Sequence, residues 1–184
     1  MYLNITIDIE TLSTSSNALI TQIGAVCDHG EFQQFVDIQN SMNAGFSVDA
    51  STITWWMKQT DEARKRFQTK GRPIVTSLEN FSEWVETMRQ AMARQVGTTP
   101  DQVEVLVWGN GAAFDNCVLS NAYRRVGVQQ PWSYKNDRCY RTLKELVECG
   151  VPHIDGVAHD ALDDARYQHA HLKMSLSKLN RKEV

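Results

Sequence analysis

Two carboxylates one residue apart, Asp8 and Glu10, follow an apolar segment near the start of the chain. This segment, residues 2–7, is rich in β-branched residues and is predicted to be a strand. Side chains at positions i and i+2 of a strand point to the same face, so the two carboxylates are expected side by side where the strand ends. Their mutual repulsion requires a counter-charge, which indicates a divalent-metal site. Two solvated carboxylates are the alternative, because Asp-x-Glu alone is a weak motif.

A third acid, Asp115, lies near the start of a helix predicted over residues 113–126. The almost wholly apolar segment 103–108 precedes it and is expected to be a central strand that is covered on both faces. Ligands of open sheets gather at strand ends near a switch in strand order, so Asp115 is well placed to join the first two acids. Viewed alone, it equally suits a carboxylate that interacts with the backbone dipole at a helix start.

A histidine and a fourth acid, His159 and Asp164, stand where the last predicted helix, residues 161–179, begins. Five helical residues correspond to roughly 500° of rotation, so the two side chains would diverge if both were helical. We therefore place His159 in the entering loop, from where it can lie over the metal site while Asp164 contributes a ligand. Acids that stabilise a helix start, beside an exposed histidine, are the alternative.

Taken in chain order, these elements resemble the three exonuclease motifs of the DnaQ-like, DEDDh superfamily of 3′-to-5′ exonucleases. The matching residues are Asp8-Ile9-Glu10-Thr11, Phe114-Asp115 and His159 with Asp164. The resemblance extends from Ile5 to about Ala170, and its flanking details look like a phage-type and RNase AS-like branch. Those details are Leu12, Ile23-Gly24-Ala25-Val26, Trp55-Trp56-Met57, the run from Trp108 to Asp115, and Arg141-Thr142-Leu143. The branch includes enzymes that act on DNA and enzymes that act on RNA, so the sugar stays open.

The resemblance implies a metal-dependent enzyme that removes nucleoside 5′-monophosphates from the 3′ end of single-stranded or overhanging nucleic acid. Two divalent cations, Mg²⁺ or Mn²⁺, would be its cofactors and would hold the scissile phosphate between them. Asp8 would bridge both ions, Glu10 and Asp164 would complete the shell of the first, and Asp115 would hold the second. His159 is the candidate general base, because an unperturbed imidazole with a pKa of about 6.5 can accept a proton near neutral pH.

Four further residues are candidate substrate contacts. Thr11 directly follows the acids, and Leu12 is expected to wedge against the terminal base unless it packs on the core. Asn110 and Phe114 are expected to line the terminal-nucleotide pocket, although Phe114 suits the core equally well.

Several aromatic and basic residues outside these motifs could also contact substrate, but other roles are open to them. Of Trp55 and Trp56, at most one is expected to face substrate, because adjacent helical residues point about 100° apart. Core packing or a subunit contact is the favoured role for them. The basic cluster Arg64–Arg66 is interpreted as a solvated helix face, and Arg141 as either a phosphate contact or a support for the sheet edge.

The predicted fold is α/β: a ribonuclease H-like mixed five-stranded sheet, with its first three strands antiparallel, flanked by helices. The 184 residues suit one exonuclease domain over positions 1–184. The expected elements are strands at 2–7, 20–26, 31–38 and 103–108, an extended piece at 132–136, and helices at 52–68 (capped by Ser51), 77–95, 113–126, 142–149 and 161–179.

Composition bears on the kind of metal or disulfide site, the cellular location and the partners that the chain can have. Four widely spaced cysteines predict neither a zinc knuckle nor a disulfide framework. The absence of a signal-peptide pattern and of any membrane-spanning stretch favours a soluble, cytoplasmic protein, and the resemblance also allows a homodimer. The net charge is −3; the four candidate acids contribute −4, which leaves +1 for the rest of the chain, so nucleic acid remains a suitable partner. A catalytically silent nucleic-acid or protein-binding module and a small-nucleotide phosphodiesterase are the rival functions.

Overall fold

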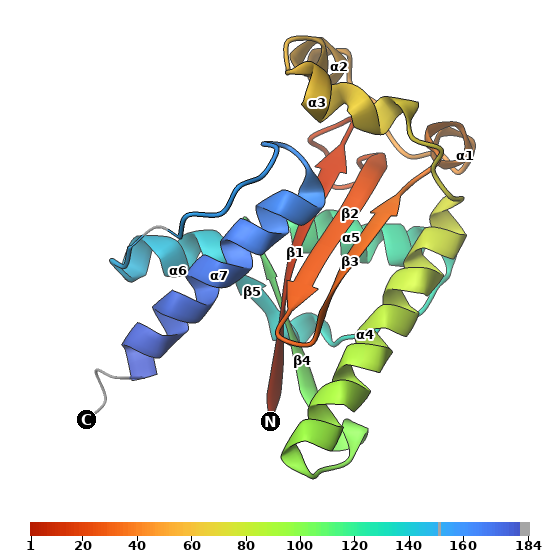
Figure 1. Cartoon of the computed structure of the whole chain (residues 1–184). Coiled ribbons are helices and arrows are strands. Elements are labelled where there is room, and N and C mark those ends of the chain that lie inside the picture. Colours follow the sequence, from red (N-terminus) through yellow and green to blue (C-terminus); the bar gives the residue numbers. More distant parts are fainter. Residues whose placement is uncertain (151, 181–184) are drawn as a thin grey trace.

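A five-stranded mixed sheet forms the centre of the computed structural model, which describes residues 1–150 and 152–180 (Figure 1). The strand order is β3-β2-β1-β4-β5. β1 pairs antiparallel with β2, which pairs antiparallel with β3, while β4 runs parallel to β1 and β5 parallel to β4. The predicted sheet, with its first three strands antiparallel, is confirmed. The strands are β1 (Tyr2–Thr11), β2 (Ile20–Cys27), β3 (Gly30–Phe35), β4 (Glu104–Gly109) and β5 (Asp137–Cys139).

Helices cover both faces of this sheet (Figure 1). On one face, Ile5, Ile7 and Ile9 of β1 belong to the largest apolar cluster, with side chains of α4 (Ile74–Val96) and α5 (Asp115–Val126). Because strand side chains alternate, Asp8 and Glu10 lie on the opposite face. That face is covered by α7 (Ala161–Asn180), and a smaller apolar cluster joins α7 to β4 and to α6 (Tyr140–Leu146).

A glycine lets α7 come close to the sheet. Gly24 of β2 pairs with Asp8 of β1, and a Cβ built on it would lie 2.2 Å from the backbone of Ala161. No real side chain fits at that distance, so any residue larger than glycine would push the start of α7 outward. Gly24 therefore brings the first turn of α7 directly over the acidic residues of β1.

The segment predicted as one helix over 52–68 is broken in three, so that prediction is wrong. It forms α2 (Ala50–Met57), α3 (Asp61–Arg64) and a 3-10 turn, η1 (Lys65–Gln68). Thr60 ends the continuity because its hydroxyl accepts a hydrogen bond from the backbone N–H of Ala63 and caps α3. The N-cap of α2 is Asp49, not Ser51. These helices lie beyond the end of β1 (Figure 1).

Other boundaries differ by a few residues. The third strand ends at Phe35 instead of residue 38, because Asp37 accepts a hydrogen bond from the Asn40 N–H and starts the unpredicted helix α1 (Ile38–Asn43). α4 begins directly after Pro73, three residues before the predicted start. The extended piece 132–136 is largely the turn η3 (Tyr134–Asn136), and η2 spans Pro100–Gln102.

The last helices show how well local patterns locate helices. α6 begins and ends earlier than the predicted 142–149, while α7 matches the predicted 161–179 to within a residue. Positions 151 and 181–184 of the predicted domain lie outside the described residues. Within the described part, no helix is long and apolar enough to cross a membrane.

Candidate active site

The acids of the first two motifs meet because β1 and β4 run parallel. Asp8 and Glu10 lie in the second half of β1, and Asp115 starts α5 just beyond the end of β4. The carboxyl ends of parallel strands lie at the same edge of a sheet, so residues more than a hundred positions apart face one another. All three carboxylates line a single cavity of about 390 Å³.

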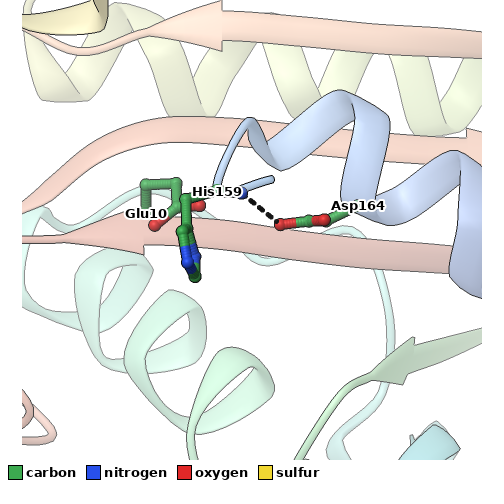
Figure 2. Close-up of side chains that lie close together, drawn as sticks. All are labelled: Glu10, His159 and Asp164. Atoms are coloured by element: carbon green, nitrogen blue, oxygen red, sulfur yellow. Dashed lines mark hydrogen bonds between the residues drawn. The ribbon is translucent and has the colours of Figure 1, made fainter. Parts of the chain in front are cut away.

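The third motif, His159 and Asp164 at the start of α7, forms a further wall of this cavity. His159 lies in the turn before α7, with a left-handed backbone φ of 65°, and its N–H donates a hydrogen bond to Asp164 Oδ2 over 3.0 Å. Figure 2 shows this bond and the side chain of Glu10 beside it. Glu10, His159 and Asp164 each offer one donor atom, and these atoms lie within 4.8 Å of one another. The five predicted catalytic residues therefore surround one cavity.

Burial raises the pKa values of all four carboxyls, and repulsion from the other site acids adds to this rise for Asp8 and Glu10. Burial, and then the charges of Asp115, Glu10 and Asp164, hold the pKa of Asp8 well above its ordinary range. Burial raises the pKa of Glu10 to about 8 against the opposing charge of Arg66.

The remaining two carboxyls follow the same trend. Burial raises the pKa of Asp115 to about 7 although backbone hydrogen bonds oppose it, and burial also raises that of Asp164. Gathered acids of this kind favour protons or a cation over the free anionic state.

The donor set fits hard divalent cations. The four acids supply carboxylate oxygens, and no cysteine lies along this cavity among the described residues. Oxygen donors suit Mg²⁺ and Mn²⁺, whose positive charge would offset the repulsion between the acids.

Arg66 is a site residue that the sequence interpretation missed. The cluster Arg64–Arg66 was predicted to be a solvated face, but Arg66 is only 7% exposed, so that prediction is wrong for it. Its guanidinium lies 3.6 Å from Glu10, donates to Gln22 Oε1 over 2.7 Å and lies over the ring of Trp56. The 3-10 turn η1 rotates Arg66 inward, which helical spacing alone does not indicate.

Gln168 is a second missed residue. Its amide Nε2 donates a hydrogen bond to Asp8 Oδ1 over 2.8 Å. Gln168 stands four residues after Asp164 on α7, so both side chains lie on the same face of the helix. This i, i+4 spacing was the signal in the sequence that could have revealed it.

The candidate substrate contacts separate into two groups. Asn110 and Phe114 line the acidic cavity, and Thr11 and Phe114 line a second cavity of about 400 Å³. Ile9, Glu10 and Phe114 line both cavities, which makes the two adjacent. Leu12 is only 7% exposed and faces an apolar hollow beside Trp56, so the structure places it in the core and not at the acidic cavity.

The two adjacent tryptophans differ in burial, as expected because adjacent helical side chains point in different directions. Trp56 is 3% exposed, and its indole Nε1 donates to the backbone oxygen of Thr11 over 2.9 Å. Trp55 is 41% exposed and forms part of the wall of the second cavity.

The sequence model of the Rv2179c-like 3′-5′ exoribonuclease domain family matches residues 3–176. The chain belongs to this exonuclease family. The match begins at the second residue of β1 and ends within α7, so it contains all three motifs. No curated protein sequence shows a significant match to the chain.

Solved structures share the fold of this exonuclease-family chain at low sequence identity. The zinc-bound complex of Escherichia coli ExoI with single-stranded DNA is 14% identical, with a TM-score of 0.59 over 98% of the chain and 42% of ExoI. The chain thus spans about two fifths of the length of ExoI. The nuclease domain of 3'hExo, a DEDDh family member bound to rAMP, is 15% identical, with a TM-score of 0.55 over 96% of the chain and 92% of that domain. The predicted ribonuclease H-like fold is confirmed.

Proposed function

We propose that the protein hydrolyses RNA from its 3′ end, in single strands or 3′ overhangs, and releases nucleoside 5′-monophosphates. The observation that carries this proposal is the convergence of four carboxylates and His159 on one cavity, in a chain of an exoribonuclease family. RNA is chosen because the family is described by exoribonuclease activity. A cytoplasmic location, a single domain over 1–184 and a homodimer stay predictions.

The proposed cofactors are two divalent cations, Mg²⁺ or Mn²⁺. Asp8 and Glu10 with Asp164 would hold one, and Asp8 with Asp115 the other. When bound, the ions would neutralise the scissile phosphate and stabilise the charge that develops on the attacking and departing oxygens. ExoI, which shares this fold, has a zinc-bound form, and the cluster of Glu10, His159 and Asp164 supports a cation at this position in the present chain.

His159 is the proposed general base. It takes a proton from the attacking water while the water oxygen forms a bond to phosphorus and the bond to the departing 3′ oxygen breaks. The departing 3′ oxygen takes up a proton from solvent water, so the products are a shortened strand with a 3′ hydroxyl and a nucleoside 5′-monophosphate. The position of the histidine supports this role, because its turn is held to the site by Asp164 and its ring lies near Glu10. A well-placed base contributes roughly 10²–10⁴-fold to the rate.

The walls around the acids suit a nucleotide strand. Phe114, between the two cavities, offers an aromatic surface for a terminal base, with Thr11 and Asn110 as polar neighbours. Arg141 and Lys144 of α6 line the acidic cavity and carry the positive charge that adjoining phosphates require. These side chains are the proposed substrate contacts.

A matched digestion tests the function. Single-stranded RNA, single-stranded DNA and duplexes with 3′ overhangs, each labelled at the 3′ end, are incubated with Mg²⁺ or Mn²⁺. We expect labelled mononucleotide as the first product, with RNA degraded faster than DNA. Substrates with a blocked 3′ end should persist.

Two variants accompany the digestion. His159→Ala should slow hydrolysis by roughly a hundredfold or more while Mn²⁺ binding, measured by calorimetry, is retained. Absence of hydrolysis with every substrate and both metals would instead identify a silent binding module. Turnover of dinucleotides alone would identify a small-nucleotide phosphodiesterase.

A further inference from the structure

The ring of His159 is not oriented in the way that general bases usually are. A base is commonly held by a third group through a hydrogen bond to its other nitrogen. Here the only hydrogen bond of His159 within the described residues comes from its backbone N–H. Its φ of 65° is a conformation that few residues other than glycine adopt, so the backbone is tightly specified, while the imidazole makes no hydrogen bond to any residue that the structure describes.

Aromatic rings take the place of that partner. The centroid of the His159 ring lies 4.8 Å from that of Trp55 at an interplanar angle of 81°, and 6.1 Å from that of Trp56 at 84°. The two tryptophans themselves meet edge to face at 4.9 Å and 77°. Perpendicular contacts at these distances are the favoured geometry for aromatic pairs, and they restrict how the imidazole can turn.

The support behind this contact is rigid. Trp56 donates a hydrogen bond to the backbone of Thr11, packs against Phe67 at 5.3 Å, and carries the guanidinium of Arg66 over its ring at 4.6 Å. Trp56 is therefore locked to the end of β1, next to Glu10. Trp55 rests on Trp56 and reaches His159, so α2 connects the acidic strand to the base.

We propose that Trp55 is a positioning residue, which holds the imidazole of His159 in the orientation that accepts the proton. The inference rests on the proposed role of His159 as the base. Trp55 also forms a wall of the second cavity, which Ser51 and Thr52 line as well. A nucleobase bound in the second cavity would contact the same indole. Occupation of that cavity would therefore affect the orientation of the His159 imidazole.

Kinetics can distinguish a tryptophan that orients His159 from one that only stacks on substrate. A tryptophan that only stacks on substrate affects binding, whereas one that orients His159 affects the chemical step even when substrate is saturating. The effect must also depend on His159. Replacing both residues should then cost no more than replacing His159 alone, because interacting residues are not additive.

The test is a double-mutant cycle in single-turnover digestion of 3′-labelled RNA at saturating protein. Trp55→Leu, which keeps apolar bulk but removes the ring, should lower the maximal rate by about threefold to tenfold. The same change in a His159→Ala background should lower it no further. Trp55→Phe, which keeps an aromatic edge, should restore the rate to within about twofold. Trp84→Leu is the matched control, because Trp84 stacks on Phe81 at 5.8 Å beneath the other face of the sheet and should leave the rate unchanged.

Two measurements without turnover separate positioning from damage to the fold. In metal-free protein, the NMR resonance of the His159 Cε1 proton should move in Trp55→Leu, because the two rings are in contact, but not in Trp84→Leu. Calorimetry should give the same Mn²⁺ affinity for Trp55→Leu as for the original chain. A changed Mn²⁺ affinity would overturn the proposal, since Trp55 would then act on the ligand set.

The outcomes also separate this inference from the proposed function. Equal losses from Trp55→Leu with and without His159, or a loss confined to substrate affinity, would overturn positioning and assign Trp55 to substrate binding. A slow His159→Ala beside a fully active Trp55→Leu would overturn only this inference. A fully active His159→Ala would overturn the base itself, and the proposal with it.

Discussion

Helix α7 meets the sheet at two groups of ionisable side chains that differ in their charge balance. Near its start, Asp164 joins Asp8 and Glu10, where acids gather around the cavity. Further along, His169 and Lys173 meet Asp28 in the turn after β2, with Lys173 Nζ 2.5 Å from Asp28 Oδ1. We call the first group the acidic centre and the second the paired cluster, formed by Asp28, His169 and Lys173.

The pKa values show what each arrangement does. Burial tends to raise the pKa of Asp28, but the hydrogen bond and charge of Lys173 and the contact with His169 outweigh it, so that pKa is lowered. In the acidic centre, burial and neighbouring acids act in the same direction and raise the pKa values of Asp8 and Glu10. The paired cluster thus stabilises the folded state. The ionised acidic centre destabilises the folded state until protons or cations bind to it. Such an unfavourable arrangement is typical of a functional site.

The largest expected effect comes from exchanging one carboxyl for an amide in each cluster. Asp8→Asn keeps the volume and the oxygen that accepts from Gln168, yet removes the charge, so hydrolysis should fall by roughly a thousandfold. Asp28→Asn should leave the rate within about twofold of the original. Initial rates on labelled RNA measure both. Comparable losses in the two variants would remove the functional distinction between the clusters.

A smaller effect should appear in the pH dependence of stability without metal. The pKa of Glu10 is about 8 in the folded protein and 4.5 ordinarily, so between these values the folded chain holds a proton that the unfolded chain has lost. Its contribution is therefore present below pH 4.5 and lost as the pH rises through about 8. The Tm measured in a chelator should fall over this interval, and Mn²⁺ at about pH 8 should raise it again.

Two variants sharpen that measurement. Glu10→Gln should make the decline less steep, because one of the groups that titrate in this interval is gone. Glu31→Gln is the control: Glu31 pairs with Arg166, its pKa is lowered, and it is already ionised over this interval. A decline of equal steepness in Glu10→Gln and the original chain would contradict the assignment.

The smallest effect is expected in the paired cluster. Lys173→Met should lower the free energy of unfolding by less than about 1 kcal/mol, because the ion pair with Asp28 is more than half exposed. The pKa of Asp28 is lowered, so its contribution is present at neutral pH and lost as the pH falls below 3.8. Denaturant titration measures the loss, which high salt should reduce further. An increase in stability would show that Lys173 does not pair with Asp28 in solution.

The parts of the fold that were predicted correctly have strong local signals. The apolar run of β4, the short turn between β2 and β3, and the long periodic helix α7 each identify themselves within about 20 residues. The region from Ala50 to Gln68 was predicted less well, since its charge spacing suits one helix. The hydroxyl of Thr60 caps a new helix there, and local propensity cannot weigh that bond against continued helix.

The candidate site shows the same division. The amino-acid sequence by itself determined the acids, the histidine and their order along the chain, because residue type and spacing state which oxygens and nitrogens a motif offers. Only the tertiary structure decided that Arg66 turns inward to Glu10, that Leu12 enters the core and that Trp55 contacts His159. These outcomes depend on the direction of a side chain after distant elements pack. Packing is a property of three-dimensional neighbours, which one-dimensional spacing does not contain.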